Sequence, residues 1–404
     1  MKMRAVLIPV CMLGCIGYAA GADFHFEGFA DLRLIVPSTQ GSYYYGDLGK
    51  TRYGYDDGKV AAELSDIVGE ESVQIRPALT AVATGRVSTH YGPAVDLIEA
   101  YARYQPSSTT AWLWSVKAGA FFPPISLEND QIGWTSAWTI TPSAINSWVG
   151  YELRTIGAEG TLEWRHAGGV LTMNGAVFGW NDPAGVLMAD RGWSFDDRVS
   201  GLLEHERIPD AMAASLRRTP PIQTRLFSEI DNSPGWYAKL SWMQAGLGHV
   251  EVMHYDNNAD PSAKTDGQFA WHTRFWDIGY RKQIGNLALL AQAMTGSTEI
   301  RPAPLRRNTT NFAAAYILAG LDIDPWRLAA RFDAFRTHTL AATPSLQNED
   351  GTAGTVSATW FATTWLQLTG EILVVDSMRP QRTLAGDPAR ATETQSQLLA
   401  RVYF

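Results

Sequence analysis

The sequence is almost free of cysteine. It has two, Cys11 and Cys15, and both lie within the first 22 residues. Without them the chain has no disulfide framework, thiolate metal site or cysteine nucleophile. Cysteine avoidance also suits a chain that crosses an oxidising compartment while unfolded. Lipidation at Cys15 is the alternative for this segment, but Met12 and Leu13 fit a lipobox poorly.

Long apolar runs are also missing. The run Ala5–Tyr18 follows Lys2 and Arg4 and precedes Ala20-Gly21-Ala22. This order predicts a signal peptide over residues 1–22 and a mature chain that begins at Asp23. The run is shorter than the roughly 18 apolar residues of a membrane-spanning helix, and no later run is longer.

Basic charge and catalytic motifs are scarce as well. The formal net charge is −8, which argues against a nucleic-acid partner. There is no Gly-x-Ser-x-Gly elbow, His-Glu-x-x-His zinc motif or phosphate-binding glycine loop. The eight histidines are scattered. We therefore predict no catalytic residues, no metal and no cofactor.

The chain does have strict alternation of apolar and polar residues. In Phe24–Val36, one face carries Phe24, Phe26, Gly28, Ala30, Leu32, Leu34 and Val36, and the other carries His25, Glu27, Phe29, Asp31, Arg33 and Ile35. This pattern is typical of transmembrane strands, with apolar residues towards lipid and polar residues towards a lumen. It predicts an all-β fold, a transmembrane antiparallel β-barrel that occupies residues 23–404.

The same pattern predicts about sixteen strands, an even number as single-chain bacterial barrels require. They are Phe24–Val36, Gly58–Ile67, Ser72–Thr89, Val95–Tyr104, Ala111–Phe122, Gly150–Arg165, Gly168–Trp180, Gly235–Gln244, Gly248–Asp256, Gln268–Lys282, Leu287–Gly296, Thr309–Leu321, Arg327–Thr337, Gly354–Thr364, Leu366–Asp376 and Thr392–Phe404. Pro77 fits badly inside its strand, because proline cannot donate to the ladder.

The links between these strands alternate in length. Short links are Trp365, Asp322–Trp326, Gln283–Asn286, Ala245–Leu247, His166–Ala167, Gln105–Thr110 and Val68–Glu71, and long ones are Arg379–Ala391, Leu340–Gly351, Glu299–Asn308, Asn257–Gly267, Asn181–Pro234, Pro123–Val149 and Pro37–Asp57. Only His90–Ala94 is short among the latter. This predicts short periplasmic turns and long extracellular loops, of which 181–234 is the longest.

The last eight residues, Gln397 to Phe404, alternate up to a terminal aromatic. This ending resembles the last strand of bacterial outer-membrane barrels. The resemblance implies the outer membrane of a Gram-negative bacterium, contact with its lipid and lipopolysaccharide, and recognition of Phe404 by the barrel-insertion machinery. An edge strand of a soluble periplasmic β-protein is the alternative.

The stretch Gly119 to Glu128 reads Gly-Ala-Phe-Phe-Pro-Pro-Ile-Ser-Leu-Glu. It resembles a stretch near the pore-constricting loop of phosphate-selective-type porins. The resemblance implies a porin, a possible homotrimer, in which small hydrophilic solutes diffuse past a constriction loop, here residues 123–149. The motif covers a small part of the chain.

The candidate loop departs from this family because it contains no lysine or arginine. An anion-selective constriction needs fixed cations, so phosphate selectivity is not predicted. The loop instead carries Glu128, Asp130, Trp134 and Trp138. Its aromatic, hydroxyl and amide side chains would suit sugars or other neutral solutes better. Alternatively, the tryptophans pack the loop against the barrel wall.

The inward faces of the predicted strands supply candidate pore-lining charges. They are Lys117, Glu159, Glu163, Lys239, Asp277, Arg331, Glu371 and Arg401. Acids and bases on opposite walls would create a transverse field, whereas interspersed ones would pair and brace the interior; we favour bracing for most of them. The predicted function is a water-filled channel for passive diffusion. The alternative is a closed barrel that acts through its extracellular loops as a surface enzyme or adhesin.

Overall fold

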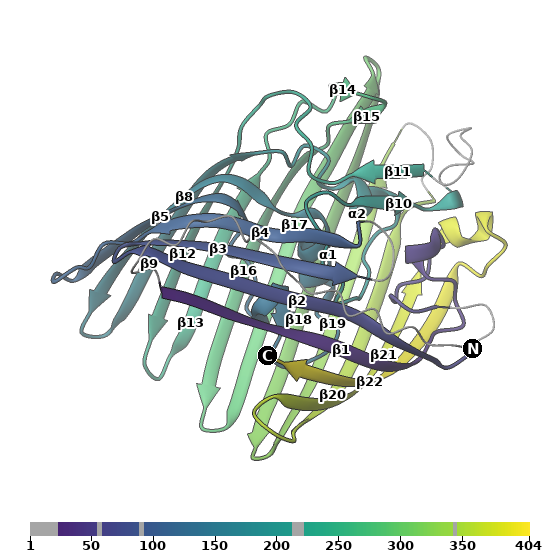
Figure 1. Cartoon of the computed structure of the whole chain (residues 1–404). Coiled ribbons are helices and arrows are strands. Elements are labelled where there is room, and N and C mark those ends of the chain that lie inside the picture. The colour runs from purple at the N-terminus through teal and green to yellow at the C-terminus, as the bar shows by residue number, and fades with distance from the viewer. Residues whose placement is uncertain (1–22, 55–58, 89–92, 212–221, 342–345) are drawn as a thin grey trace.

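The computed structural model describes residues 23–54, 59–88, 93–211, 222–341 and 346–404. The predicted signal peptide, residues 1–22, lies outside this part. Among the described residues, no helix is both long and apolar enough to cross a membrane. The dominant feature is one closed antiparallel barrel of sixteen strands (Figure 1), which confirms the predicted fold class.

The barrel strands follow one another around the wall in chain order. They are β1 (Asp23–Val36), β2 (Ala61–Arg76), β3 (Leu79–Ser88), β4 (Val95–Tyr104), β5 (Trp112–Phe121), β8 (Thr155–His166), β9 (Gly169–Gly179), β12 (Gly235–Gln244), β13 (Gly248–Asp256), β16 (His272–Ile284), β17 (Leu287–Ala303), β18 (Arg306–Ile323), β19 (Trp326–Leu340), β20 (Glu349–Phe361), β21 (Leu366–Met378) and β22 (Arg390–Tyr403).

The connecting loops contain the remaining elements. These are η1 (Tyr43–Tyr45), β6 (Asn129–Gln131), η2 (Ile132–Trp134), β7 (Thr135–Ser136), α1 (Ala144–Glu152), α2 (Val186–Asp190), β10 (His205–Ile208), β11 (Ile222–Arg225), β14 (Lys264–Thr265), β15 (Gln268–Phe269) and η3 (Pro380–Leu384). Long loops gather at one end of the barrel, here called the loop end, and tight hairpins at the other, the turn end (Figure 1).

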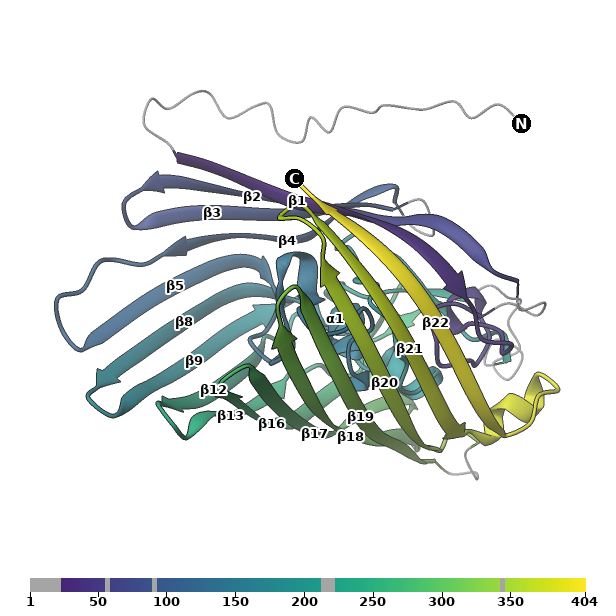
Figure 2. The ribbon, with the colours of Figure 1, turned by 90° about the horizontal axis from the view of Figure 1, so that it is seen from below.

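The barrel closes where β1 pairs with β22, in a register that runs from Phe29 opposite Tyr403 to Val36 opposite Ser396. Gly28 and Phe404 extend this seam, because each backbone N–H donates to the other residue's carbonyl, at 2.9 and 3.0 Å. A Cβ on Gly28 would lie 2.6 Å from the Phe404 ring. Figure 2 shows the two strands side by side.

Alternation along the strands sorts the side chains as predicted. In β1, Asp31 and Arg33 are buried inside, whereas Leu32 and Leu34 are exposed on the outside. Isoleucine, leucine, valine and phenylalanine cover the outer band, where lipid replaces water as the solvent. Aromatic residues ring the turn end, including the stacked pairs Trp112–Trp164 and Trp326–Trp360. Such girdles mark the membrane interface.

Several predicted boundaries were wrong, including the start of Gln268–Lys282, whose first two residues belong to β15 rather than to a barrel strand. The turn predicted at Val68–Glu71 lies inside β2, and the chain instead turns at Pro77 and Ala78. Proline has no N–H to donate, so the ladder breaks there. Gly150 to Glu152, predicted to begin a strand, end α1 instead.

A further error concerns the link Glu299–Asn308, predicted to be a long loop. Strands β17 and β18 extend through most of it and turn at Pro304 and Leu305. Glu299 pairs with Arg301 at 2.6 Å within β17 and with Arg307 on β18. These ion pairs allow polar residues to continue the hairpin beyond the apolar band. The alternation of link lengths therefore holds except here and near His90–Ala94.

Candidate functional site

The candidate site is the barrel lumen, which is occupied by the chain's own loops. Residues 122–154, here called the constriction segment, leave β5 and cross the interior (Figure 2). Gln292 on β17 donates to the carbonyl of Ile125 at 2.8 Å, and Lys239 on β12 donates to that of Pro124. At Gly133 the segment reaches Val68 on β2. The predicted loop 123–149 therefore folds into the lumen.

Arg331 on β19 also holds this segment. Its guanidinium donates to the carbonyls of Thr141 and Pro142 at 2.8 and 2.9 Å. It also pairs with Glu128 at 3.3 Å and Asp333 at 2.8 Å. The side chain is fully buried. A planar guanidinium with five N–H donors can hold all these acceptors at once.

Carboxylates surround the start of α1. Glu128 accepts from the backbone N–H of Ser143 at 2.7 Å, and Asp333 accepts from that of Ala144 at 3.2 Å. Glu371 on β21 accepts from Thr141 N–H at 3.1 Å. Negative charge at a helix N-terminus satisfies its free N–H groups and complements the helix dipole. The wall thus fixes both the position and the direction of α1.

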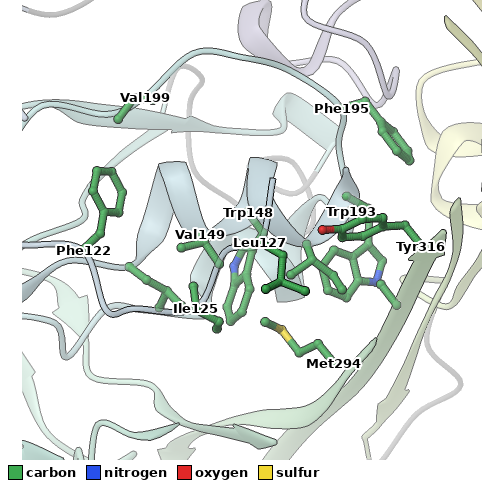
Figure 3. Packing of buried hydrophobic residues seen from close by; sticks show 14 of the residues in the cluster. Phe122, Ile125, Leu127, Trp148, Val149, Trp193, Phe195, Val199, Met294 and Tyr316 are labelled. Carbon is green, nitrogen blue, oxygen red and sulfur yellow. The ribbon is translucent and has the colours of Figure 1, made fainter. Parts of the chain in front are cut away.

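Apolar packing completes this attachment (Figure 3). The Trp148 ring on α1 lies 5.2 Å from Phe312 and 5.6 Å from Phe275, centroid to centroid. Trp193, from the long loop, packs 6.1 Å from Trp148 on the loop-end side. Interlocked aromatic rings leave little space at this level, so the segment is a packed plug on the side of β16 to β22.

The two predicted tryptophans of the segment also pack rather than point into open space. Trp134 stacks on Phe122 with ring centroids 3.9 Å apart. Trp138 lies against Gly320 on β18, where a Cβ would be 2.1 Å from its ring. Asp130 is at the exposed tip and pairs with Arg281 at 3.2 Å. These positions correspond to the packed alternative described above.

The remaining predicted pore-lining residues face the lumen in pairs. Lys117 pairs with Glu159 at 3.3 Å, Lys239 with Glu251 at 2.7 Å, Glu163 with Arg165 at 2.6 Å, Arg401 with Asp31 at 2.8 Å, and Asp277 accepts from Gln292 at 3.0 Å. Apart from Asp277, whose partner is a neutral amide, opposite charges are therefore neighbours rather than occupants of opposite walls. This is the bracing arrangement.

Other lumenal residues carried no signal in the sequence. At the loop end, Lys50 and Arg379 both pair with Glu349 at 2.8 Å, and Arg382 pairs with Glu393 at 3.3 Å. These residues come from separate loops and strands. Their sequence separations leave no local pattern that would predict the contacts.

Glu152 joins the two helices of the plug. Its carboxylate, at the end of α1, accepts from the N–H groups of Gly185 and Leu187 at 3.2 and 2.9 Å, and from the Trp148 indole. Burial raises the pKa of Glu152 to about 7. The ordinary pKa of a glutamate side chain is near 4.5. The docked state therefore favours the protonated carboxyl at pH values where an undocked Glu152 would be ionised.

We expect the contact between α1 and α2 to weaken as the pH rises. Between pH 4.5 and 7 the docked state binds more protons than an undocked one, so its free-energy advantage falls across this window and stays low above it. Hydrogen exchange of amides 185–190, corrected for intrinsic rate, should therefore be faster at pH 8 than at pH 5.

The substitution Glu152→Gln should reduce this pH difference, because glutamine does not titrate. Glu163→Gln is the matched control, since Glu163 lies at the turn end, away from both helices. Equal pH dependence in wild type and Glu152→Gln would contradict the assignment.

Three carboxylates converge in the long loop, those of Asp182, Glu229 and Asp231, with ligand atoms within 4.8 Å of one another. Each accepts backbone N–H groups, as Asp182 does from Ile230 and Glu229 from Trp180. These bonds account for the cluster as loop structure.

Comparison with solved structures shows the same fold at very low sequence identity. The outer membrane channel DcaP of Acinetobacter baumannii matches with a TM-score of 0.56 and 11% identity over 96% of this chain and 99% of that one. A loop L8 deletion mutant of OmpT, an outer membrane protein of Vibrio cholerae, gives 0.53 and 9% over 95% and 99%. OmpF of Salmonella typhi, in complex with daunomycin, gives 0.53 and 11% over 96% and 99%.

No protein-family model and no curated protein matches the chain. The fold is that of Gram-negative outer-membrane β-barrels of the porin-like type. The resemblance to the phosphate-selective group stays a prediction from its motif.

Proposed function

We propose that the protein is an outer-membrane porin that lets small hydrophilic solutes diffuse passively across the membrane. The observation that carries this proposal is the constriction segment, which crosses the lumen of a sixteen-strand barrel and is fixed to one side of it. A loop held in this way narrows a channel instead of forming a surface feature.

The turn end of the lumen supports the proposal. A cavity of about 410 Å³ lies against β3 to β5 and is lined by Thr80, Val82, Tyr101, Arg103 and Leu113, among others. Beyond it, Asp130 and Arg281 keep 41% and 39% of their side chains exposed. Polar, water-accessible walls below a loop constriction are typical of diffusion channels.

The proposal assigns the loops to narrowing the lumen rather than to surface catalysis or adhesion. The constriction segment and residues 191–200 lie inside the barrel, and their polar groups bond to its wall and to one another. The proposal also includes contact of lipid and lipopolysaccharide with the apolar band, and recognition of Phe404 by the barrel-insertion machinery. A homotrimer is also included, since one similar structure, OmpT of Vibrio cholerae, is described in a trimer form.

Conductance tests this function. Purified protein added to a planar lipid bilayer should give discrete current steps whose size scales with salt concentration. The control is the same preparation after heat denaturation. Folded protein that inserts but produces no steps would contradict the proposal, and binding or turnover by intact cells displaying the loops would then favour the alternative.

A further inference from the structure

Part of the long loop runs deep inside the lumen. Residues 191–200 pass between α1 and the wall formed by β1 to β3. Phe195 N–H donates to the Lys50 carbonyl at 2.8 Å, and Asp196 N–H donates to the Ser147 hydroxyl at 3.1 Å. Further along, the carbonyl of Val199 accepts from Arg86 on β3. These bonds fix the position of the residue between them, Asp197.

Asp197 places its carboxylate on two arginines. Arg33 on β1 grips both carboxylate oxygens, with Nη1 3.0 Å from Oδ1 and Nη2 on Oδ2. Arg52, from the link after β1, adds a bond from its Nη1 to Oδ1 at 3.1 Å. All three side chains are at least nine-tenths buried. Two guanidinium groups around one carboxylate form a typical carboxylate-recognition geometry.

This contact lies where the wall, the long loop and the constriction segment meet. A cavity of about 20 Å³, the size of one water molecule, is lined by Arg33, Arg86 and Arg401, by Asp197, and by Gly133 and Thr135 of the constriction segment. Within the described residues, Nε of Arg33 and Nε of Arg86 are buried and have no hydrogen-bond partner. Two of the arginines that line the cavity therefore each have one N–H donor without a partner.

Other carboxylates besides Asp197 surround the arginines at this level. Arg401 is held by Asp31 and Arg86 by Glu204. Asp31 also reaches Arg33 at 3.1 Å, and Asp66 reaches Arg52 at 3.3 Å. Of these carboxylates, Asp31 and Asp66 belong to wall strands, whereas Asp197 and Glu204 come from the long loop. Without Asp197, Arg33 and Arg52 would each lose one carboxylate partner.

We propose that Arg33 and Arg52 form a binding site for the carboxylate group of anionic solutes, and that Asp197 occupies this site as an internal competitor. The inference rests on the proposed channel function. A tethered carboxylate competes at an effective concentration in the millimolar range or above. It therefore excludes solute carboxylates from the wild-type site and keeps the long loop against the wall. Solutes would gain access when residues 191–200 move away.

The experiment compares ion selectivity in planar bilayers. Asp197→Ala should raise the chloride-to-potassium permeability ratio at least threefold, measured as the reversal potential in a potassium chloride gradient. Asp197→Asn keeps the shape of the side chain and one acceptor oxygen, so it should give an intermediate permeability ratio. This variant replaces Asp197→Ala in the experiment if the alanine variant fails to assemble. Asp210→Asn is the matched control, since Asp210 pairs with Arg207 in the same loop but is 41% exposed.

Formate is the probe for the emptied site, because it replaces the carboxylate that alanine lacks. Formate should reduce the chloride current of Asp197→Ala saturably, with at least a fivefold weaker effect on wild type and Asp210→Asn. Unchanged permeability ratios together with no selective formate effect would overturn the inference while leaving the channel function intact. An absence of current in all forms would instead contradict the channel function.

Discussion

Replacing Arg331 with methionine is expected to release the constriction segment and to raise the single-channel conductance several-fold. The substitution leaves Glu128 and Asp333 buried without their cation. Removing one partner of a buried ion pair typically costs about 3–5 kcal/mol, and here the cost falls on the docked position of the segment. The barrel should still assemble, since backbone bonds between β19 and its neighbours set the register.

The measurement combines bilayer conductance with limited proteolysis of residues 122–154. Arg336→Met is the matched control, because Arg336 lies on the same strand, is exposed on the outer face and is followed by the same loop. Conductance and proteolysis equal to those of the control would show that Arg331 does not hold the segment.

Replacing Ile317 with arginine is expected to destabilise the barrel in lipid by about 2–4 kcal/mol, the cost of a cation near the middle of the apolar band. Ile317 lies on the outer face of β18, opposite Phe332 in the register, and is 62% exposed. In a membrane, this exposed side chain contacts acyl chains. A charged side chain at the same position would therefore lose its hydrating water.

Urea unfolding from phospholipid vesicles, followed by tryptophan fluorescence, measures this cost. Asn311→Arg provides the control on the same strand and face, six residues nearer the loop end, where the expected cost is about 0–1 kcal/mol. Similar free energies of unfolding for the two variants would mean that the outer band does not lie in the bilayer as the fold implies.

The faces of the strands were predictable because a period of two depends only on local sequence. Leu398 and Arg401 fall outside and inside as their parity requires. Boundary errors arose where a single residue decides the geometry. Pro77, for example, ends the pairing of β2 with β3 at the first turn. The extension of β17 and β18 includes an ion pair between the strands, Glu299 with Arg307, which the sequence of a single strand does not show.

The contents of the lumen were predictable only as a set of inward charges. Which acid meets which base depends on the shear of the barrel and on loops that return from distant parts of the chain. Asp197 illustrates this, since Arg33 and Arg52 lie 164 and 145 residues away in sequence. The position of the constriction segment was suggested by its motif, but its attachment through Arg331 was not.

The seam between β1 and β22 has a consequence for biosynthesis. It joins parts of the chain as far apart as Asp31 and Arg401, which are separated by 370 residues. Before β22 pairs with β1, the sheet has two free edges with unpaired N–H and C=O groups. Such unpaired backbone groups are energetically costly in lipid. A polypeptide that ends before β22 would therefore stay an open sheet, because it lacks the strand that pairs with β1.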